Sequence, residues 1–415
     1  MAVDEVTALD RKRPAAIGAI NRVGGALGRI GVQPRLDVAG LIRAACKQTG
    51  LDDFGGDDFR PGLDRLVASL EDDARLTTLG RIAARTRIVR LLVTRLQLVD
   101  HAKHHPEVAA QEIHEPVFVL GLPRTGTTVL YGLLAADPSF RSPVSWEVAT
   151  PVPPPNRDVS PDDPRIRAAE KDFDQLRRIA PGVDAIHPLG ALLPQECMSL
   201  QAPSFLSYEF PTTFPVHGYW AWLQEQDLTP AYEQQKRYLQ HLQSGYASER
   251  WILKTPAHLL SLDVLLDVFP DARVIQTHRD PTTVIASVSS LMYALRSAVS
   301  DHVDPADVGR DQLATWSRGL EEALRIRDAR LPADRVIDVD FRDTVDDPVA
   351  TVQRIHDHFG WKFDDQVAAG IRAYLDENPR TKHGRHTYAL EQFGLTKAQA
   401  DQAFAGYRAR FGMTD

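Results

Sequence analysis

VFVLGLPRTGTTVL, residues 117–130, passes from an apolar segment through a turn with two glycines into a segment of helical character. The apolar residues 117–120 predict a buried strand, and Gly126 allows the backbone to approach a ligand closely. The N–H groups of Thr125 to Thr128 are expected to point into the turn, together with the positive end of the following helix. Arg124 adds a guanidinium whose fork matches two anionic oxygens. The stretch therefore predicts a loop that binds phosphate.

The same loop lacks two features of a loop that binds a nucleoside triphosphate. Gly121 and Gly126 have the required spacing, but this chain has Thr127 where a nucleotide hydrolase places a lysine. The sequence also offers no convincing acidic strand end to hold Mg²⁺. The loop is better suited to a single 5′-phosphate group than to a triphosphate with its metal.

Strands and helices are expected to alternate after this loop. The further strands are Trp251–Leu253, Arg273–Thr277 and Arg335–Val339, and the helical patterns between them lie at 259–269, 281–297 and 309–331. This alternation predicts an α/β fold with a P-loop-like, doubly wound parallel sheet flanked by helices. Ligands of such sheets bind where the strands end and the helices begin.

Two other parts of the chain have mainly helical character. Residues 1–115 form the first, with helices expected around Val38–Ala45 and over Thr78–Lys103. The inward side of the second of these helices should carry Leu79, Ile82, Ile88, Leu91, Leu92 and Leu96. The other part, about 151–250, begins with a proline-rich stretch and is rich in tryptophan and tyrosine. We therefore expect an N-terminal helical region, 1–115, and an α/β domain, 116–415, with a helical insertion at about 151–250.

Composition excludes several classes of protein. Of the 415 residues 43% are hydrophobic and 25% are charged, as in a folded globular enzyme. The net charge of −8 argues against nucleic acid as a partner, because neutralising phosphates requires a basic surface. Two cysteines are too few for a disulfide framework or a four-thiolate metal site. The N-terminus lacks a signal-peptide core and no apolar run approaches the roughly 20 residues that span a bilayer, so we expect a cytoplasmic protein without a transmembrane segment.

The phosphate loop resembles that of the sulfotransferases, and of the bacterial sulfotransferase family in particular. In that superfamily the pattern P-[KR]-[ST]-G-[ST]-[ST] follows the first strand and binds the 5′-phosphosulfate of 3′-phosphoadenosine 5′-phosphosulfate (PAPS). The matching residues here are Pro123, Arg124, Thr125, Gly126, Thr127 and Thr128. The resemblance implies that PAPS is the cofactor, that adenosine 3′,5′-bisphosphate is the product and that no metal is needed.

A second, independent match lies in RVIQTHRDPTTVIASVSSLM, residues 273–292. Sulfotransferases of this type bind the 3′-phosphate of the cofactor with an arginine at a strand end and a serine eight residues later, and Arg279 and Ser287 have that spacing. Asp280 is expected to cap the helix that follows, with Pro281 at its first position. A late segment, 335–361, is similar to the closing β-α unit of the family, so the resemblance covers about residues 115–360.

The resemblance also implies catalytic residues. Lys254 matches the lysine that binds the bridging oxygen to the leaving phosphate. Glu147 is the first candidate for the base, because several sulfotransferases of glycans and tyrosine place a glutamate just beyond the helix after the loop. His258 is the second candidate, because the cytosolic enzymes carry a histidine two residues after the lysine, where this chain has Pro256.

Two further comparisons with the cytosolic enzymes are looser. A basic, glycine-containing stretch near the C-terminus resembles the element that closes on the 3′-phosphate, although the order of its residues differs, and it nominates Lys382 and Arg385. Those enzymes also place a tryptophan just after the phosphate loop to contact adenine. Here Val129 stands at that position, so the adenine contacts stay unassigned.

Together these matches predict a sulfotransferase that moves a sulfuryl group by in-line transfer from PAPS to a hydroxyl or amine. A small molecule, a lipid or a glycan would each serve as the acceptor, and the sequence does not decide between them. The alternatives are a P-loop kinase or NTPase, which would depend on Mg²⁺ and ATP, and a catalytically idle nucleotide-binding protein.

Overall fold

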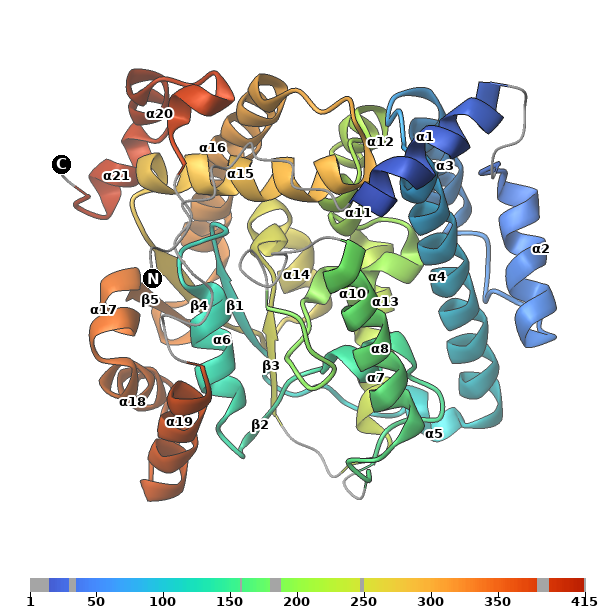
Figure 1. The fold of residues 1–415 in the computed structure, drawn as a ribbon. Helices are drawn as coiled ribbons and strands as arrows, with labels where there is room; N and C mark the ends of the chain where they lie inside the picture. The colour runs from blue at the N-terminus through green and yellow to red at the C-terminus, as the bar shows by residue number, and fades with distance from the viewer. Residues whose placement is uncertain are drawn as a thin grey trace.

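Five parallel strands form one sheet near the centre of the molecule (Figure 1). The structure is a computed structural model that describes residues 15–29, 35–156, 159–179, 188–246, 250–378 and 388–413. The strands lie in the order β2-β3-β1-β4-β5. They are β1 (Val117–Gly121), β2 (Phe140–Arg141), β3 (Arg250–Lys254), β4 (Arg273–His278) and β5 (Val336–Asp340). The predicted doubly wound parallel sheet is confirmed. Strand β2 was not predicted, because a strand of two residues is too short to show a periodic pattern in the sequence.

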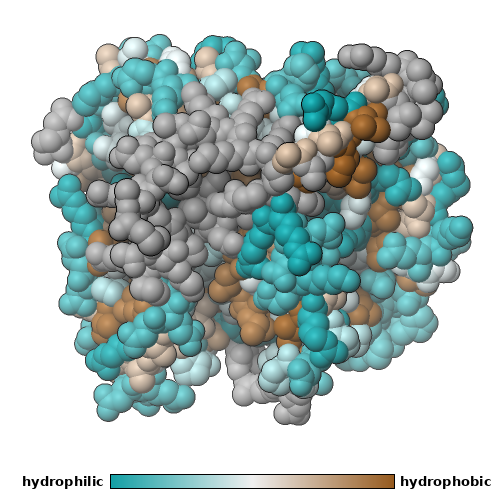
Figure 2. All heavy atoms as spheres, viewed as in Figure 1, coloured by the Kyte–Doolittle hydropathy of each residue, from teal (hydrophilic) through white to brown (hydrophobic). Residues whose placement is uncertain are grey.

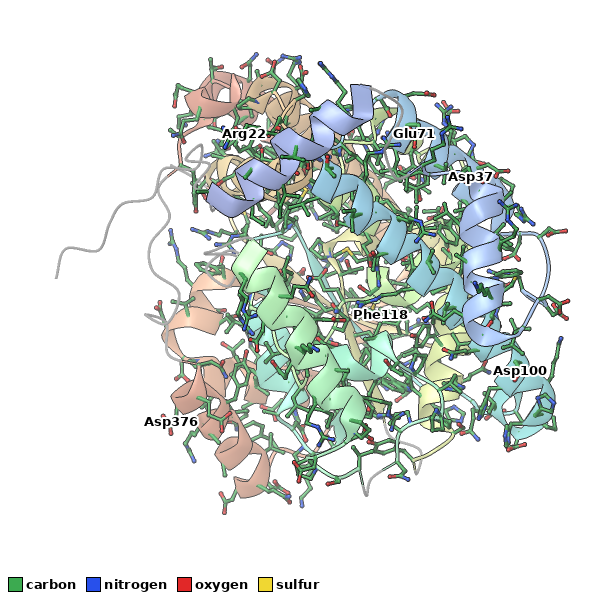
Figure 3. All side chains as sticks on the ribbon, turned by 45° about the vertical axis from the view of Figure 1, so that its right-hand side comes forward. Arg22, Asp37, Glu71, Asp100, Phe118 and Asp376 are labelled. Atoms are coloured by element: carbon green, nitrogen blue, oxygen red, sulfur yellow. The ribbon has the colours of Figure 1, made fainter. Side chains whose placement is uncertain are left out.

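Helices cover both faces of this sheet, as the alternation of side chains along β1 shows. Val117 and Val119 pack on one face with α6 (Thr127–Ala135), α18 (Pro348–Phe359) and α19 (Asp365–Glu377). Phe118, labelled in the interior in Figure 3, and Leu120 pack on the other face. The helices there are α10 (Cys197–Gln201), α13 (Thr229–Gln243), α14 (Leu262–Val268), α15 (Pro281–Val299) and α16 (Pro305–Arg330). Each strand of the centre is therefore buried on both sides.

The N-terminal helices share a hydrophobic core with helices of the predicted insertion. The N-terminal elements are α1 (Ala15–Arg29), α2 (Val38–Thr49), α3 (Arg60–Asp72), α4 (Thr78–His104) and α5 (Pro106–Ala109), and the partners from the insertion are α11 (Glu209–Thr213) and α12 (His217–Leu223). Leu63 and Leu92 pack in one cluster with Phe205, Phe210 and Tyr219. The two helical segments, far apart in sequence, thus form one layer beside the sheet (Figure 1).

The inward face predicted for α4 needs one correction. Ile88, Leu91, Leu92 and Leu96 are buried, but the side chain of Ile82 is 44% exposed. Ile82 lies in the second turn of α4, where the neighbouring Arg81 is buried and pairs with Glu71 of α3. Helix α1 packs against α4, but Ile82 itself stays partly exposed. A repeat of apolar residues indicates a helix correctly, but it does not tell where along the helix the packing partners end.

In the described part of the chain, α15 is the single helix long and apolar enough to cross a membrane by length and composition. Of its apolar window, 67% is buried inside the molecule. Asp280 caps this helix through a hydrogen bond from the Thr282 N–H (3.0 Å), and Pro281 is its first residue, as the sequence predicts. Its neighbours in the structure are α16 and the end of the phosphate loop, so its apolar surface faces protein.

Candidate active site

The phosphate loop leaves the end of β1 beside the end of β4. Gly121 pairs with Thr277 in the sheet and has φ of +150°, and a Cβ added there would lie 2.2 Å from the Thr277 hydroxyl oxygen. The Thr125 hydroxyl lies 2.7 Å from the same Thr277 oxygen and 2.6 Å from the Leu122 carbonyl oxygen, to which it donates. Thr125 therefore holds the loop in shape, and Thr277, which sequence reasoning missed, is its partner.

The turn into α6 requires glycine. Gly126 is the N-cap of α6 with φ of +86°, and a Cβ there would lie 2.9 Å from the ring of Phe341. The first N–H groups of a helix have no carbonyl within the helix to bond, so those at the start of α6 form an anion-binding end. Thr127 is buried and Thr128 is exposed at this end. Phe341 opens α17 (Phe341–Asp346) directly after β5, and nothing in its sequence context marks it as part of the site.

The two predicted anion-binding segments meet. Arg124, with φ of +70°, donates from Nε to the Ser287 hydroxyl (3.2 Å). Arg279 donates from Nη1 to the Arg124 carbonyl (3.1 Å), and its guanidinium carbon lies 4.3 Å from the centre of the Phe341 ring. Arg124 and Arg279 are 155 residues apart in the chain. The fold therefore brings Arg124, Arg279 and Ser287 to one place at the carboxyl edge of β1 and β4, where a single anionic ligand can contact all of them.

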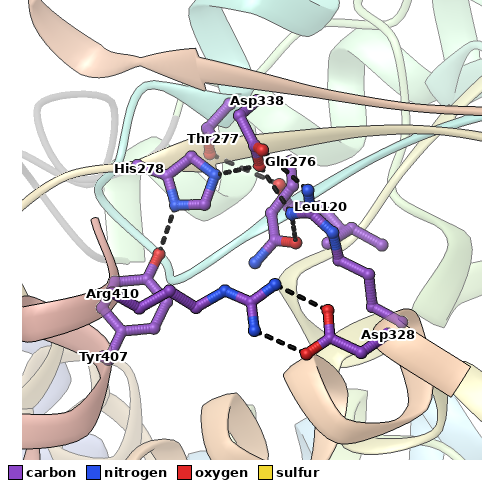
Figure 4. A network of polar contacts seen from close by, with 9 residues as sticks. Leu120, Gln276, Thr277, His278, Asp328, Asp338, Tyr407 and Arg410 are labelled. Atoms are coloured by element: carbon purple, nitrogen blue, oxygen red, sulfur yellow. Dashed lines mark hydrogen bonds and ion pairs between the residues drawn. The ribbon is translucent and has the colours of Figure 1, made fainter. Parts of the chain in front are cut away.

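A polar network behind Arg279 fixes the end of β4 (Figure 4). His278 contacts the Tyr407 hydroxyl through Nδ1 (2.6 Å) and the Asp338 carboxylate through Nε2 (2.6 Å). Arg327 of α16 donates to the same carboxylate (2.6 Å). Although partial burial favours the neutral acid, the hydrogen bonds from Arg327 and His278 hold the pKa of Asp338 well below its usual range. The network ties β4 to β5, α16 and α21 (Ala405–Arg410), so the backbone that carries Arg279 is firmly placed.

Lys254 ends β3 and reaches the same edge of the sheet. It is 1% exposed, and its Nζ donates to the Thr128 hydroxyl at the start of α6 (3.2 Å). The same Nζ forms a buried ion pair with the Glu196 carboxylate. The other oxygen of that carboxylate accepts a hydrogen bond from the Thr255 hydroxyl (3.1 Å). A carboxylate, an ammonium and a loop hydroxyl are thus linked beside the anion-binding end of α6.

Glu196 is a further residue that sequence reasoning missed. It is the N-cap of α10 inside the predicted insertion, and it is 8% exposed. The Gln195 N–H donates to the Pro143 carbonyl (2.7 Å), and the Tyr131 hydroxyl of α6 donates to the Gln195 carbonyl (3.1 Å). These bonds bring the insertion onto α6, so the position of Glu196 depends on tertiary contacts. An acidic residue in LLPQECMSL was the available signal, and it was not enough to distinguish Glu196 from other glutamates.

Glu147 belongs to a different set of contacts. Its carboxylate accepts from Arg141 Nη2 (3.2 Å) and from the Val144 N–H (3.4 Å), which is how it caps α7 (Ser145–Ala149). Burial raises the pKa of Glu147, and the nearby Arg141 guanidinium opposes that rise. Arg141 also donates to the Leu242 carbonyl (2.7 Å) and lies over the ring of Trp251. Each of these contacts is structural, joining β2 to the insertion.

His258 lies in the core. It is 0% exposed in η2 (Pro256–Leu260), its ring meets Phe118 of β1 edge-on, and its Nδ1 lies 2.7 Å from the Tyr232 hydroxyl. Burial lowers the pKa of His258 to about 3, so the ring is neutral near pH 7. His258 lies two positions beyond Pro256, and at that position the imidazole packs into the hydrophobic face of the sheet. A base must reach the proton that it removes, and this position is closed to an acceptor.

Buried neutral histidines predict a loss of stability in mild acid. Burial lowers the pKa of His241 to about 4 and that of His258 to about 3, whereas an unfolded histidine titrates near 6.5. The unfolded chain therefore binds more protons below pH 6.5, and the stabilisation that is complete above this pH is lost as the pH falls towards 4. We expect the free energy of unfolding to decrease by about 1.4 kcal/mol per pH unit for each of the two histidines.

Urea unfolding curves at several pH values between about 6.5 and 4 measure this slope. In His258→Gln, which keeps a polar partner for Tyr232, the slope should fall by about 1.4 kcal/mol per pH unit over the same range. A slope equal to that of the unmodified protein would show that His258 does not titrate differently in the folded and unfolded chains.

Three other positions complete the predicted set. Lys382 and Arg385 lie outside the described residues. Val129, which replaces the tryptophan of the cytosolic enzymes, is 44% exposed on the first turn of α6, beside Thr128.

Comparison with known proteins points to one family. A sequence profile described as the sulfotransferase family matches residues 116–365. The solved sulfotransferase STF1 of Mycobacterium tuberculosis is 36% identical, with a TM-score of 0.81 over 90% of this chain and 99% of that chain. STF9 of Mycobacterium avium is 31% identical, with a TM-score of 0.83 over 91% and 97%. The omega-hydroxy-beta-dihydromenaquinone-9 sulfotransferase Stf3 of Mycobacterium tuberculosis is 26% identical over 72% of this chain and 75% of its own.

Proposed function

The chain belongs to the sulfotransferase family and is an enzyme, and we propose that it uses PAPS to sulfate a hydroxyl group of its acceptor by in-line transfer. The contact of Arg279 with the Arg124 carbonyl carries the proposal, because it joins the predicted 5′-phosphosulfate site to the predicted 3′-phosphate site. In the proposed site, Arg124, Thr127, Thr128 and the N–H groups at the start of α6 bind the 5′ end. Arg279 and Ser287 bind the 3′-phosphate.

The residues at the site fit such a donor. Two guanidiniums, a serine hydroxyl and a helix N-terminus offer only positive charge and hydrogen-bond donors, which is what two separated phosphate groups require. Bound PAPS supplies the activated sulfuryl group and departs as adenosine 3′,5′-bisphosphate. The chain supplies the binding, the orientation and the movement of the proton.

Glu196 and Lys254 are the proposed catalytic pair. The Glu196 carboxylate takes the proton of the acceptor hydroxyl while the acceptor oxygen forms its bond to sulfur. The bond between sulfur and the bridging oxygen breaks, and its electron pair stays on the leaving 5′-phosphate. The Lys254 ammonium donates a hydrogen bond to that oxygen as charge develops on it. The ion pair holds the two side chains next to each other before the acceptor binds.

This proposal replaces Glu147 and His258 as candidate bases. Glu147 is engaged by Arg141 and by the backbone of α7, and His258 is enclosed between β1 and α13. Glu196 contacts the lysine that the family comparison assigns to the leaving group, and through Lys254 it is linked to Thr128 of the phosphate loop. Geometry therefore favours Glu196.

A lipid alcohol is the acceptor that we propose to test first. The name of Stf3 describes sulfation of a menaquinone that carries a terminal hydroxyl. Transfer of labelled sulfate from PAPS to long-chain alcohols, compared with phenols, sugars and amines of similar size, would rank the acceptor classes. Equal transfer to a sugar or an amine would contradict a preference for lipid alcohols.

Ligand-dependent stability tests the donor. At a concentration about 100 times Kd, adenosine 3′,5′-bisphosphate should raise the free energy of unfolding by about 2.7 kcal/mol, whereas Mg-ATP should leave it unchanged. Thermal unfolding with each ligand measures both effects. Arg279→Ala should remove most of the stabilisation by adenosine 3′,5′-bisphosphate. Stabilisation by Mg-ATP alone would favour a kinase or NTPase. Stabilisation by the bisphosphate without any transfer of sulfate would favour an idle nucleotide-binding protein.

A further inference from the structure

Helix α1 packs against the rest of the protein through its small and polar side. The Asn21 side-chain oxygen accepts the Leu79 N–H at the start of α4 (3.2 Å). One turn later, Gly24 approaches Thr78 so closely that an added Cβ would lie 2.2 Å from the threonine hydroxyl oxygen. Asn21 and Gly24 therefore fix which side of α1 faces the protein.

This orientation leaves the apolar side of α1 in solvent. Ile20 is 45% exposed and Val23 is 62% exposed, and Ala19 and Ala26 on the same side are also exposed. On α4, the helix that holds α1, Ile82 is also 44% exposed. Figure 2 shows apolar residues gathered over α1. A helix of a soluble core normally buries its apolar side, so the reversed orientation indicates a surface that contacts something else.

The stretch of sequence that contains α1 carries charge of one sign. Between Asp10 and Asp37 the sequence contains six cations, at 11, 12, 13, 22, 29 and 35, and no acidic residue, in a chain whose net charge is −8. Arg22 is exposed on α1, where Figure 3 labels it. Asp301 is the acidic residue that borders the same cavity as Arg22. An apolar helix face within a basic segment matches an anionic lipid surface, which offers acyl chains and negative headgroups together.

We propose that α1 docks this enzyme on an anionic phospholipid bilayer, with Ile20 and Val23 inserted among the acyl chains. The proposal rests on the orientation and charge of α1 and does not depend on the proposed donor or acceptor. A second copy of this chain fits less well, because two such segments would bring their cations together. Figure 1 places α1 with α15 on the side to which the carboxyl ends of the strands point, so docking would turn the active-site side towards the bilayer.

Vesicle flotation with the full chain tests this docking. The protein should float with vesicles of phosphatidylcholine and phosphatidylglycerol, should not float with phosphatidylcholine alone, and should be released by high salt. Ile20→Gln/Val23→Gln should weaken binding by about tenfold or more, and Arg22→Gln should weaken it by about fivefold. Leu176→Gln is the matched control, because it alters an exposed apolar side chain on a different helix, α8 (Pro164–Ile179). This variant should bind the vesicles as well as the unmodified protein.

Either of two kinds of result, from flotation or from the oligomeric state, would overturn the proposal. The first is an unmodified protein that fails to float with the anionic vesicles, or an Ile20→Gln/Val23→Gln variant that floats as well as the unmodified protein. The second is a dimer, detected by analytical ultracentrifugation without vesicles, that the double substitution converts to monomer while vesicle binding is absent. Thermal unfolding should be unchanged in each variant, because the substituted side chains are exposed.

Discussion

Replacement of Glu196 by glutamine is expected to lower kcat by about 10² to 10⁴-fold, the range that a positioned general base contributes. The amide keeps the size of the side chain, and its oxygen can accept from Lys254 while its NH2 group donates to the Thr255 hydroxyl, but it cannot take a proton from the acceptor. Affinity for adenosine 3′,5′-bisphosphate should change little, because Arg124, Arg279 and the start of α6 are intact. Steady-state transfer of labelled sulfate and titration with the bisphosphate measure the two effects separately.

Glu147→Gln is the matched control for this substitution. It removes the carboxylate that pairs with buried Arg141, so it should lower the free energy of unfolding by about 3 kcal/mol. The folded variant should keep a kcat within about tenfold of the unmodified enzyme, since an unaltered base retains its contribution. If Glu147→Gln abolishes turnover and Glu196→Gln preserves it, the assignment of the base is reversed.

Replacement of Lys254 by methionine should lower kcat by about 10² to 10³-fold, because one aimed donor to the developing charge on the leaving group is lost. Methionine matches the length of the lysine stem without its charge. The substitution also leaves the Glu196 carboxylate buried without its cation, which should cost about 3 kcal/mol of stability. Single-turnover transfer and urea unfolding are the two measurements.

A double variant separates the two effects of Lys254. In Lys254→Met/Glu196→Gln no buried charge is left unpaired, so most of the lost stability should return while kcat stays low. A double variant that recovers turnover would contradict both proposed roles, because it lacks the proposed base Glu196 as well as the proposed donor Lys254. A double variant as unstable as Lys254→Met would show that the ion pair is not the source of the instability.

Local chemistry explains which parts of the site the sequence predicted. The phosphate loop is one continuous stretch of eight residues. Within it, the spacing of the glycines, the threonines and Arg124 are enough to indicate an anion-binding turn. Arg279 and Ser287 were named by the resemblance to sulfotransferases, because they match the spacing of an arginine at a strand end and a serine eight residues later. The strands β1, β3, β4 and β5 were predicted to within about a residue at each end, because buried apolar runs between helices are readable.

The rest of the site depends on contacts between distant segments. Glu196 lies 58 residues before Lys254, and only the packing of the insertion on α6 brings the two together. Phe341 reaches Gly126 and Arg279 from the far edge of the sheet. His258 lies close in sequence to the position expected for a catalytic histidine, but its side chain is buried in the core. Spacing along a chain does not report the direction of a side chain after an irregular turn.

The core that α3 and α4 share with α11 and α12 has a consequence for how the chain is made. The N-terminal helices leave the ribosome long before their aromatic partners, Phe205, Phe210 and Tyr219, have been synthesised. Until then the leucines of α3 and α4 have no apolar surface of the insertion to cover them. The N-terminal helices can therefore complete their packing only after the insertion has been synthesised. During that interval their apolar surfaces are accessible to chaperones that bind exposed apolar helices.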